Sequence, residues 1–262
     1  DGLALSQWLL VRQRVLGAVG SDSDVEESGA FAWIPTLTSI SRQAIFSGEV
    51  PVAFGSSLLT TAKEESWWRR FWEDRGVQRG QIAYVRQKDK EADADFYARA
   101  VQKIEHPGVY RLGLVVNTVD YALHDAAAEM SWLHSLVTRW RDDAHLPNLV
   151  AKLIEQNFDV CLTSDHGNIE SRGIGKPDAG DVPEISASRA FVFPDPHTRR
   201  VHAERFPGTV EWPGVGLPPG NFALMAPSRG SFLDMGSRAV SHGGMSLEEV
   251  IVPFVSIARR RP

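Results

Sequence analysis

The stretch Phe158-Asp159-Val160-Cys161-Leu162-Thr163 is followed, after Ser164, by Asp165-His166-Gly167-Asn168. The first part is a short apolar run, which indicates a strand. In open α/β sheets, ligands bind beyond the carboxyl ends of strands, and Asp165 and His166 stand at such an end. A turn explains the Asp, the Gly and the Asn, but it gives no reason for the His. The pair therefore predicts two ligands of a divalent metal ion.

Two further polar residues occupy the same position relative to a predicted strand. Thr38 follows the apolar run 31–34, and Asp120 follows the central strand predicted at 112–116. Isolated polar residues placed at random would not readily give this coincidence. It strengthens the prediction of a single site at the carboxyl ends of the strands.

Two histidines are further candidates for metal ligands. His124 is spaced i, i+4 from Asp120, so a helix that contains both residues projects them from one face. The ordinary alternative is an acidic first turn followed by a surface histidine. His242 lies in Ser241-His242-Gly243-Gly244, where two glycines let the backbone approach an ion closely. Its alternative is an incidental histidine in a glycine turn.

Thr38 is the candidate nucleophile. It opens a helix predicted over 38–46 that ends at Gly48, and a threonine there is ordinarily an N-cap. A hydroxyl at a helix N-terminus also points where N–H groups and the helix dipole favour phosphate. A bound metal would lower its pKa and make it a nucleophile. Arg42, one turn later, is a candidate for phosphate binding, but we expect an exposed helix arginine.

Alternation of strands and helices predicts an α/β fold with a mainly parallel sheet covered by helices on both faces. We expect helices over 3–17, 38–46, 93–104, 120–140 and 148–157, and strands over 29–34, 81–86, 110–116, 158–163 and 251–257. The acidic stretch 20–29 is expected to be an exposed loop. Thr61 and Glu64 fit a capping box that opens an aromatic-rich helix.

Two segments admit more than one interpretation. The aromatic residues Trp67, Trp68, Phe71 and Trp72 suit either a stacking platform for bases or a helix packed on the sheet, and their helical spacing favours packing. Residues 174–227 hold nine of the fifteen prolines. We expect this part to be a loop-rich insertion, a cap or the rim of a cleft, within one domain that spans 1–262.

Composition restricts the class of protein. With 262 residues and a net charge of −5, the composition does not indicate a general nucleic-acid binder. Cys161 is the single cysteine, and we expect it to be a buried small hydrophobe in a protein of the reducing cytoplasm. The sequence has neither a secretory signal nor an apolar run of membrane-spanning length. Because no strand precedes Asp1, we expect the chain to be a piece of a longer protein.

At these residues the chain resembles the alkaline phosphatase superfamily, which includes nucleotide pyrophosphatases/phosphodiesterases, cofactor-independent phosphoglycerate mutases and phosphopentomutases. The superfamily order is an Asp at the first strand end, a Ser or Thr nucleophile, Asp-x-x-x-His, Asp-His and a late His. In this sequence the order is met by Asp1, Thr38, Asp120, His124, Asp165, His166 and His242.

Within the superfamily, the sequence is most similar to the PglZ domain. The similarity lies in three stretches, which are Asp1-Gly2-Leu3, Ile34-Pro35-Thr36-Leu37-Thr38-Ser39-Ile40-Ser41-Arg42 and Ser241-His242-Gly243-Gly244-Met245-Ser246-Leu247-Glu248-Glu249-Val250-Ile251-Val252-Pro253. PglZ proteins belong to BREX-type phage-defence systems, alongside a DNA methyltransferase and ATPases. In longer members the domain lies toward the C-terminus.

The resemblance implies a two-metal hydrolase of phosphate esters. Asp1, Thr38, Asp165 and His166 would hold one ion, and Asp120, His124 and His242 the other. Thr38 would attack phosphorus to give a phosphothreonine, which water then releases. Mixed Asp and His ligands suit zinc or manganese better than magnesium.

The resemblance also implies the partners, namely a phosphate-ester substrate, with nucleotides or nucleic acid as candidates, and other proteins of the defence system. We therefore expect the enzyme to be a phosphodiesterase rather than a phosphomonoesterase. A phosphomutase is an alternative, for which 174–227 is short. A catalytically inactive scaffold of a defence complex is another, against which the seven ligand-type residues argue.

Overall fold

A computed structural model describes residues 1–58, 60–124, 129–177 and 185–260, except for the side chains of His124, Ile185 and Ser186. Its longest strands, β1 (Ser23–Phe31) and β12 (Ile251–Arg259), pair in antiparallel fashion along their whole length. The other edge of β12 pairs with β4 (Val160–Thr163), also antiparallel. The strand predicted before the Asp-His pair is therefore confirmed.

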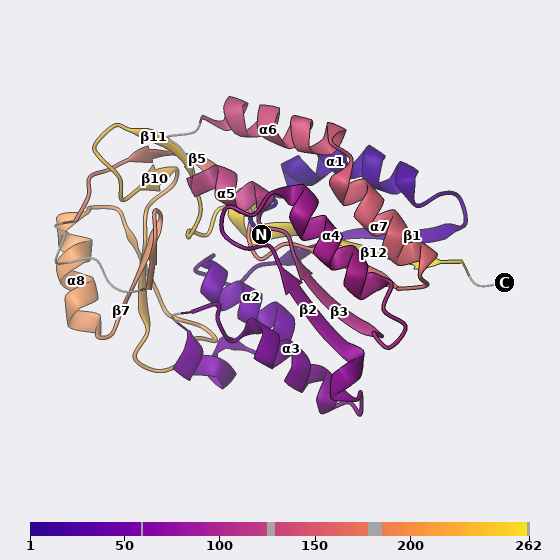
Figure 1. The fold of residues 1–262 in the computed structure, drawn as a ribbon. Helices are drawn as coiled ribbons and strands as arrows, with labels where there is room; N and C mark the ends of the chain where they lie inside the picture. Colours follow the sequence, from indigo (N-terminus) through magenta and orange to yellow (C-terminus); the bar gives the residue numbers. More distant parts are fainter. Residues whose placement is uncertain (59, 125–128, 178–184, 261–262) are drawn as a thin grey trace.

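A second pair of strands lies between two layers of helices. β2 (Ile82–Arg86) and β3 (Arg111–Val115) are parallel. α4 (Asp93–Ile104) and α7 (His145–Glu155) pack on one side of this pair in a shared apolar core. On the other side lie α2 (Thr38–Ser47) and α3 (Glu64–Glu73) (Figure 1).

The largest core cluster lies between helices and the long sheet. α1 (Leu5–Ala18) and α6 (Met130–Asp142) join α7 over β12 (Figure 1). Trp8, Val11 and Val15 share one face of α1, and they are buried in the same cluster as Val255 and Ile257 of β12. This burial explains the helical spacing of apolar residues that predicted α1.

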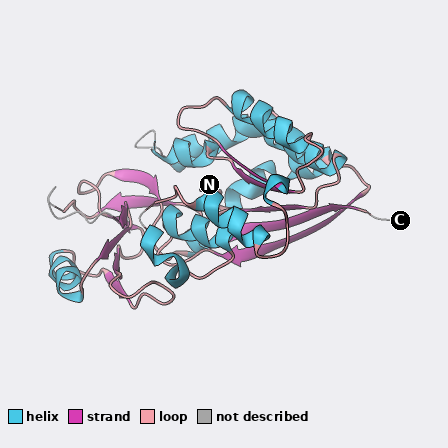
Figure 2. Cartoon of the chain, turned by 60° about the horizontal axis from the view of Figure 1, so that its bottom comes forward, coloured by secondary structure: helices cyan, strands magenta, loops and turns pink. Residues whose placement is uncertain are grey.

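Residues 174–227 hold more regular structure than their prolines suggest. An antiparallel sheet has the order β6 (Ile185–Ala187), β7 (Ala190–Phe193), β9 (Phe222–Met225), β8 (Val210–Trp212). α8 (Pro196–Arg205) packs beside it. Figure 2 shows this sheet and α8 at the end of the molecule opposite the C-terminus. A small ladder has the order β10 (Gly230–Ser231), β5 (Ile169–Gly173), β11 (Arg238–Ser241), and β5 begins directly after Asp165-His166-Gly167-Asn168.

The chain thus has an α/β fold with helices on both sides of its strands. The ladders in the described part are mixed, because β2–β3 and β10–β5 are parallel whereas the pairs of the long sheet and of the 174–227 region are antiparallel. The mainly parallel sheet therefore stays a prediction. No helix in the described ranges has both the length and the apolar character needed to cross a membrane.

The long sheet is more exposed at its edges than the sequence indicates. The stretch predicted as an exposed loop over 20–29 is wrong from Ser23 onward, where β1 begins. Most β1 side chains are exposed on both faces, so no alternation of apolar and polar residues marks the strand. Cys161, expected to be buried, is exposed on β4. β1 and β4 are the two outer strands of this sheet in the described structure.

Two predictions about helices are also wrong, and a third is confirmed. The helix predicted over 120–140 is divided into α5 (Thr118–His124) and α6, because Glu129 is extended and forms the N-cap of α6. The capping box of Thr61 and Glu64 does not form, since Lys63 precedes α3 without a side-chain cap. The aromatic helix does pack inward, with the indole N–H of Trp68 donating to the carbonyl of Ala83.

Candidate functional site

Thr38 lies at the start of α2 with its hydroxyl directed at a histidine. Leu37 is the N-cap residue, so the helix does not need the Thr38 side chain as a cap. The hydroxyl oxygen of Thr38 lies 3.0 Å from Nε2 of His166. Gly48 ends α2 in the left-handed region at φ 66°, as predicted. The helix therefore presents the Thr38 hydroxyl to the residues that follow β4.

The tautomer of His166 is fixed by the backbone. Its Nδ1 lies 3.0 Å from the carbonyl oxygen of Gly167, and only a protonated Nδ1 donates there. In the neutral imidazole, the lone pair is therefore on Nε2. This nitrogen lies 3.4 Å from Oδ2 of Asp165 and 3.7 Å from Oδ1 of Asp1. A fully buried imidazole held in this way by a carbonyl is typical of a metal ligand.

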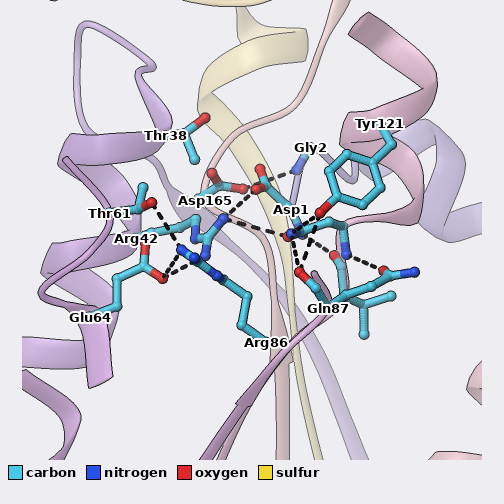
Figure 3. A network of polar contacts seen from close by, with 12 residues as sticks. Asp1, Gly2, Thr38, Arg42, Thr61, Glu64, Arg86, Gln87, Tyr121 and Asp165 are labelled. Carbon is cyan, nitrogen blue, oxygen red and sulfur yellow. Dashed lines mark hydrogen bonds and ion pairs between the residues drawn. The ribbon is translucent and has the colours of Figure 1, made fainter. Parts of the chain in front are cut away.

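Asp1 and Asp165 bring two buried carboxylates beside this imidazole. Figure 3 shows these two carboxylates next to each other. The backbone nitrogen of Asp1 donates to the carbonyl of Val116, directly after β3, over 2.9 Å. The next amide, that of Gly2, donates to Oδ1 of Asp165 over 3.0 Å. The segment that begins at Asp1 is thus tied both to β3 and to the end of β4.

The second oxygens of these carboxylates are suited to a cation. Oδ1 of Asp1 and Oδ2 of Asp165 are buried, and neither accepts a hydrogen bond from the residues that the structure describes. A buried carboxylate oxygen without a donor is costly unless a positive charge compensates it. Ligand atoms of Asp1, Asp165 and His166 all lie within 4.8 Å of one another. This donor set fits one divalent ion.

His242 and Asp120 form a second group around the same histidine. The ring of His242 is stacked on that of His166, with centroids 3.8 Å apart and planes 5° apart. Its Nδ1 lies 2.9 Å from the carbonyl of Thr36, which assigns the proton to Nδ1 and makes Nε2 the nitrogen that can bind a metal. Ligand atoms of Asp120, His166 and His242 also lie within 4.8 Å of one another.

The charges in the site match the needs of a metal. Burial opposes the charge of Asp165, but the neighbouring His166, Arg42 and the amide of Gly2 outweigh it and lower the pKa of Asp165. Burial and the adjacent His166 lower the pKa of His242 to about 3. At neutral pH the carboxylate is ionised and the imidazole neutral, and these are the forms that bind divalent metals.

The loop that carries His242 is held from two sides. The hydroxyl of Thr36 donates to the carbonyl of Gly244 over 3.0 Å and accepts from the amide of Gly243 at the same distance. The carboxylate of Glu249 accepts from the amide of Gly244 over 2.7 Å. Glu249 is itself paired with Arg189, which lies directly before β7 and is 1% exposed. This loop therefore links the candidate site to the antiparallel sheet.

Gly167 is required by close backbone packing. Its amide donates to the carbonyl of Glu249 over 2.8 Å, and a Cβ at this position would clash with the backbone oxygen of Glu248. The glycine of Asp-His-Gly-Asn thus lets the His166 segment lie against the segment that follows His242.

We expect Gly167→Ala to lower the free energy of unfolding by about 1–3 kcal/mol, since the added methyl group forces backbone movement. Urea denaturation of the metal-free protein measures this change. Gly17→Ala in α1 is the matched control, because a Cβ there meets no atom within 4 Å. It should be neutral or stabilising. A Gly167→Ala variant as stable as this control would contradict the packing argument.

Six of the seven residues predicted from the sequence meet around His166, and they are Asp1, Thr38, Asp120, Asp165, His166 and His242. The seventh, His124, is the last residue of α5, and its side chain lies outside the described residues.

Three residues that sequence reasoning missed hold the site together. Asn168 donates to the carbonyl of Gly2 over 2.8 Å and accepts from the buried Gln7 over 2.9 Å. Within Asp-His-Gly-Asn, Asn168 was explained only as a turn residue. Thr36 lies in a stretch that carries the family resemblance, but no role was assigned to it, and Gln7 gave no signal, because its partner is far away in the sequence.

Comparison with known proteins places the whole fold in one family. The chain matches the family model of the BREX system PglZ alkaline phosphatase-like domain over residues 1–257. No match was found among curated proteins.

Solved structures with the same fold include a nucleotide phosphodiesterase and a phosphonate hydrolase. Murine ectonucleotide pyrophosphatase/phosphodiesterase 5 is 14% identical, with a TM-score of 0.70 over 98% of this chain and 86% of its own. An inactive threonine-to-alanine variant of that protein, in complex with AMP, is 13% identical with the same TM-score. It covers 98% of this chain and 85% of its own. Phosphonoacetate hydrolase from Sinorhizobium meliloti 1021, in complex with phosphonoformate, is 15% identical, with a TM-score of 0.64 over 98% of this chain and 87% of its own. At these identities the similarity concerns the fold.

Proposed function

Since the chain belongs to the family of BREX-system PglZ alkaline phosphatase-like domains, we propose that it is a metal-dependent phosphoesterase, and in the first place a phosphodiesterase. The observation that carries this proposal is the 3.0 Å contact between the Thr38 hydroxyl and Nε2 of His166. It sets a hydroxyl among buried carboxylates and imidazoles. Such surroundings are typical of an activated nucleophile.

The donor groups divide between two divalent ions. The first ion would be held by Asp1, Thr38, Asp165 and His166, and the second by Asp120, His124 and His242. Zinc or manganese suits these mixed oxygen and nitrogen donors. When bound, such ions lower the pKa of a coordinated oxygen and neutralise charge that develops on a phosphoryl group.

The chain's own residues prepare Thr38 for attack on phosphorus. In the neutral imidazole, the bond from Nδ1 of His166 to Gly167 leaves the lone pair on Nε2, which lies 3.0 Å from the Thr38 oxygen, so both atoms can face the first ion. The N-terminus of α2 directs its dipole toward a phosphoryl group at Thr38. Attack forms the bond from Thr38 oxygen to phosphorus and expels the alcohol. Water then attacks the phosphothreonine, releases phosphate monoester and restores the hydroxyl.

A nucleotide or a nucleic-acid end is the substrate class we favour. The AMP complex of the structurally similar phosphodiesterase supports it by analogy, as does the BREX assignment of the family. We propose that the other proteins of the defence system are the partners, in the cytoplasm. We also propose that residues 1–262 form one catalytic domain with the 174–227 region as its rim, an arrangement supported by the Arg189–Glu249 ion pair.

The proposal is tested with purified protein and bis-p-nitrophenyl phosphate or a dinucleotide as substrate. We expect hydrolysis with zinc or manganese, loss of hydrolysis after chelation, and recovery when the metal is returned. Phosphoryl exchange between sugar phosphates without net hydrolysis would favour the phosphomutase alternative. If the protein binds no metal and its melting temperature does not change when chelator is added, the inactive scaffold is favoured. Either result would overturn the proposed function.

A further inference from the structure

Arg42 is buried, although the sequence predicts an exposed helix arginine. It is 5% exposed and lies one turn after Thr38 on α2. Its guanidinium bridges two carboxylates, with Nη1 2.6 Å from Oδ2 of Asp1 and Nη2 2.5 Å from Oε2 of Glu64. Figure 3 shows Arg42 between these two acids, close to Asp165. One arginine thus connects a proposed metal ligand with an acid on another helix.

Glu64 is placed to hold Arg42 and not to cap a helix. It is 1% exposed at the start of α3, and its Oε2 also accepts a hydrogen bond of 2.6 Å from the Tyr84 hydroxyl. Burial raises the pKa of Glu64, against the opposing effects of Arg42 and Tyr84. The hydroxyl of Thr61, its predicted capping partner, accepts from Arg86 instead. The failed capping box therefore has a structural reason, which is that the Glu64 carboxylate turns inward.

Fold stability alone is a weak explanation for this arrangement. Removing a charged pair from water costs several kcal/mol per ion, and the pairing often does no more than compensate. Here the buried Arg42 faces the acids Asp1 and Glu64, with Asp165 nearby, and the exposed Arg86 lies 4.0 Å from Glu64. Three acids thus face two arginines, so negative charge exceeds positive charge. The excess negative charge lies on the side of Asp1 and Asp165, whose carboxylate oxygens Oδ1 and Oδ2, respectively, accept no hydrogen bond in the described structure. That side is where the proposed ion would bind.

We propose that Arg42 and Glu64 are positioning residues that set the metal affinity of the site. Arg42 occupies Oδ2 of Asp1, so Oδ1 alone is presented as a metal ligand and the rotation of the carboxylate is fixed. Glu64 determines where the guanidinium stands, and among the described contacts it reaches Asp1 through Arg42. This inference rests on the metal site of the proposed function. It adds Glu64, a residue of α3, to the groups that control that site.

The fork shape of arginine is what this position requires. A planar guanidinium holds two carboxylates at a fixed angle, whereas the ammonium of lysine is a point charge that does not reproduce this geometry. Arg42→Lys therefore keeps the charge and loses the bridge. Glu64→Gln keeps an acceptor oxygen and loses the charge. Tyr84→Phe removes only the hydrogen bond to Glu64, and it is the mildest of the three changes.

The test compares metal affinity with the stability of the metal-free protein. Zinc and manganese binding are titrated by calorimetry for wild type, Arg42→Lys, Glu64→Gln and Tyr84→Phe, and melting temperatures are recorded without metal. We expect affinity to fall about 10–100-fold for Arg42→Lys and Glu64→Gln, the range for residues that support ligands. Tyr84→Phe should give a smaller loss with a near-normal melting temperature. The matched controls are Arg12→Lys and Glu27→Gln, which alter an ion pair outside the site and should bind metal like wild type.

The outcomes separate this inference from the proposed function. If wild type binds metal and the three variants bind it equally well, while some melt earlier, Arg42 and Glu64 are structural and the inference fails alone. If wild type binds neither metal, the proposed function is wrong, and so is the inference that rests on it. Selective loss of affinity in the fold-competent Tyr84→Phe protein supports the inference even where Glu64→Gln does not fold.

Discussion

Thr38→Ala is expected to lower kcat/KM for bis-p-nitrophenyl phosphate by at least about 1000-fold, because removal of a covalent nucleophile leaves only the contribution of binding and charge. The alanine keeps the helix, since Leu37 and not Thr38 is the N-cap of α2. Metal binding should persist through the remaining ligands. Steady-state hydrolysis with and without added zinc or manganese measures the loss of activity.

Two neighbouring changes serve as controls for this result. Thr38→Ser retains the hydroxyl and should retain most of the activity. Ser39→Ala removes a hydroxyl from the same helical turn and should leave kcat/KM unchanged. Trapping by acid quench should label Thr38 with a p-nitrophenyl phosphoryl group in wild type and leave the alanine variant unlabelled. Equal hydrolysis by wild type and Thr38→Ala would contradict the assignment of the nucleophile.

The residues at strand ends were predictable because their signals are local. Asp165 and His166 follow an apolar run directly, and Asp120 stands just after a strand end. β3 and β4 belong to different ladders in the described structure, and Asp120 and His166, which follow them, nevertheless lie in the same site. The family resemblance added Asp1, whose partners Val116 and Arg42 no local pattern reveals.

The supporting residues were not predictable, because their environment is set by distant parts of the chain. An arginine on a helix is ordinarily exposed. Arg42 is buried because Glu64 of α3 and the distant Asp1 both form ion pairs with it. Thr61 and Glu64 have the spacing of a capping box. The Glu64 carboxylate instead forms an ion pair with the buried Arg42, and the box does not form. The first part of β1, residues 23–28, was missed for a related reason, since its exposed side chains carry no period and its partner β12 lies at the far end of the sequence. The end of β1 falls within the strand predicted over 29–34.

His166→Ala is expected to remove one metal ion and to lower hydrolysis as severely as the loss of Thr38. By distance alone, His166 could be a ligand in either of two metal sites, one with Asp1 and Asp165 and one with Asp120 and His242. Its Nδ1 is engaged with Gly167, so a single lone pair remains on Nε2, and one lone pair binds one ion. Nε2 faces Thr38, Asp1 and Asp165, which assigns His166 to the ion of the nucleophile.

The metal content of two histidine variants tests this assignment. His166→Ala should retain the ion of Asp120 and His242, whereas His242→Ala should retain the ion of Thr38, so each protein binds about one ion where wild type binds two. His202→Ala is the matched control, because His202 is likewise a buried imidazole whose Nδ1 contacts a backbone carbonyl, but it lies on α8 and packs on Phe193 of β7. It should bind metal like wild type, so any loss common to all three variants would reflect the removal of a buried ring. Loss of both ions from His166→Ala alone would mean that the stacked imidazoles support each other's ligand positions, and the assignment of His166 to one ion would then be wrong.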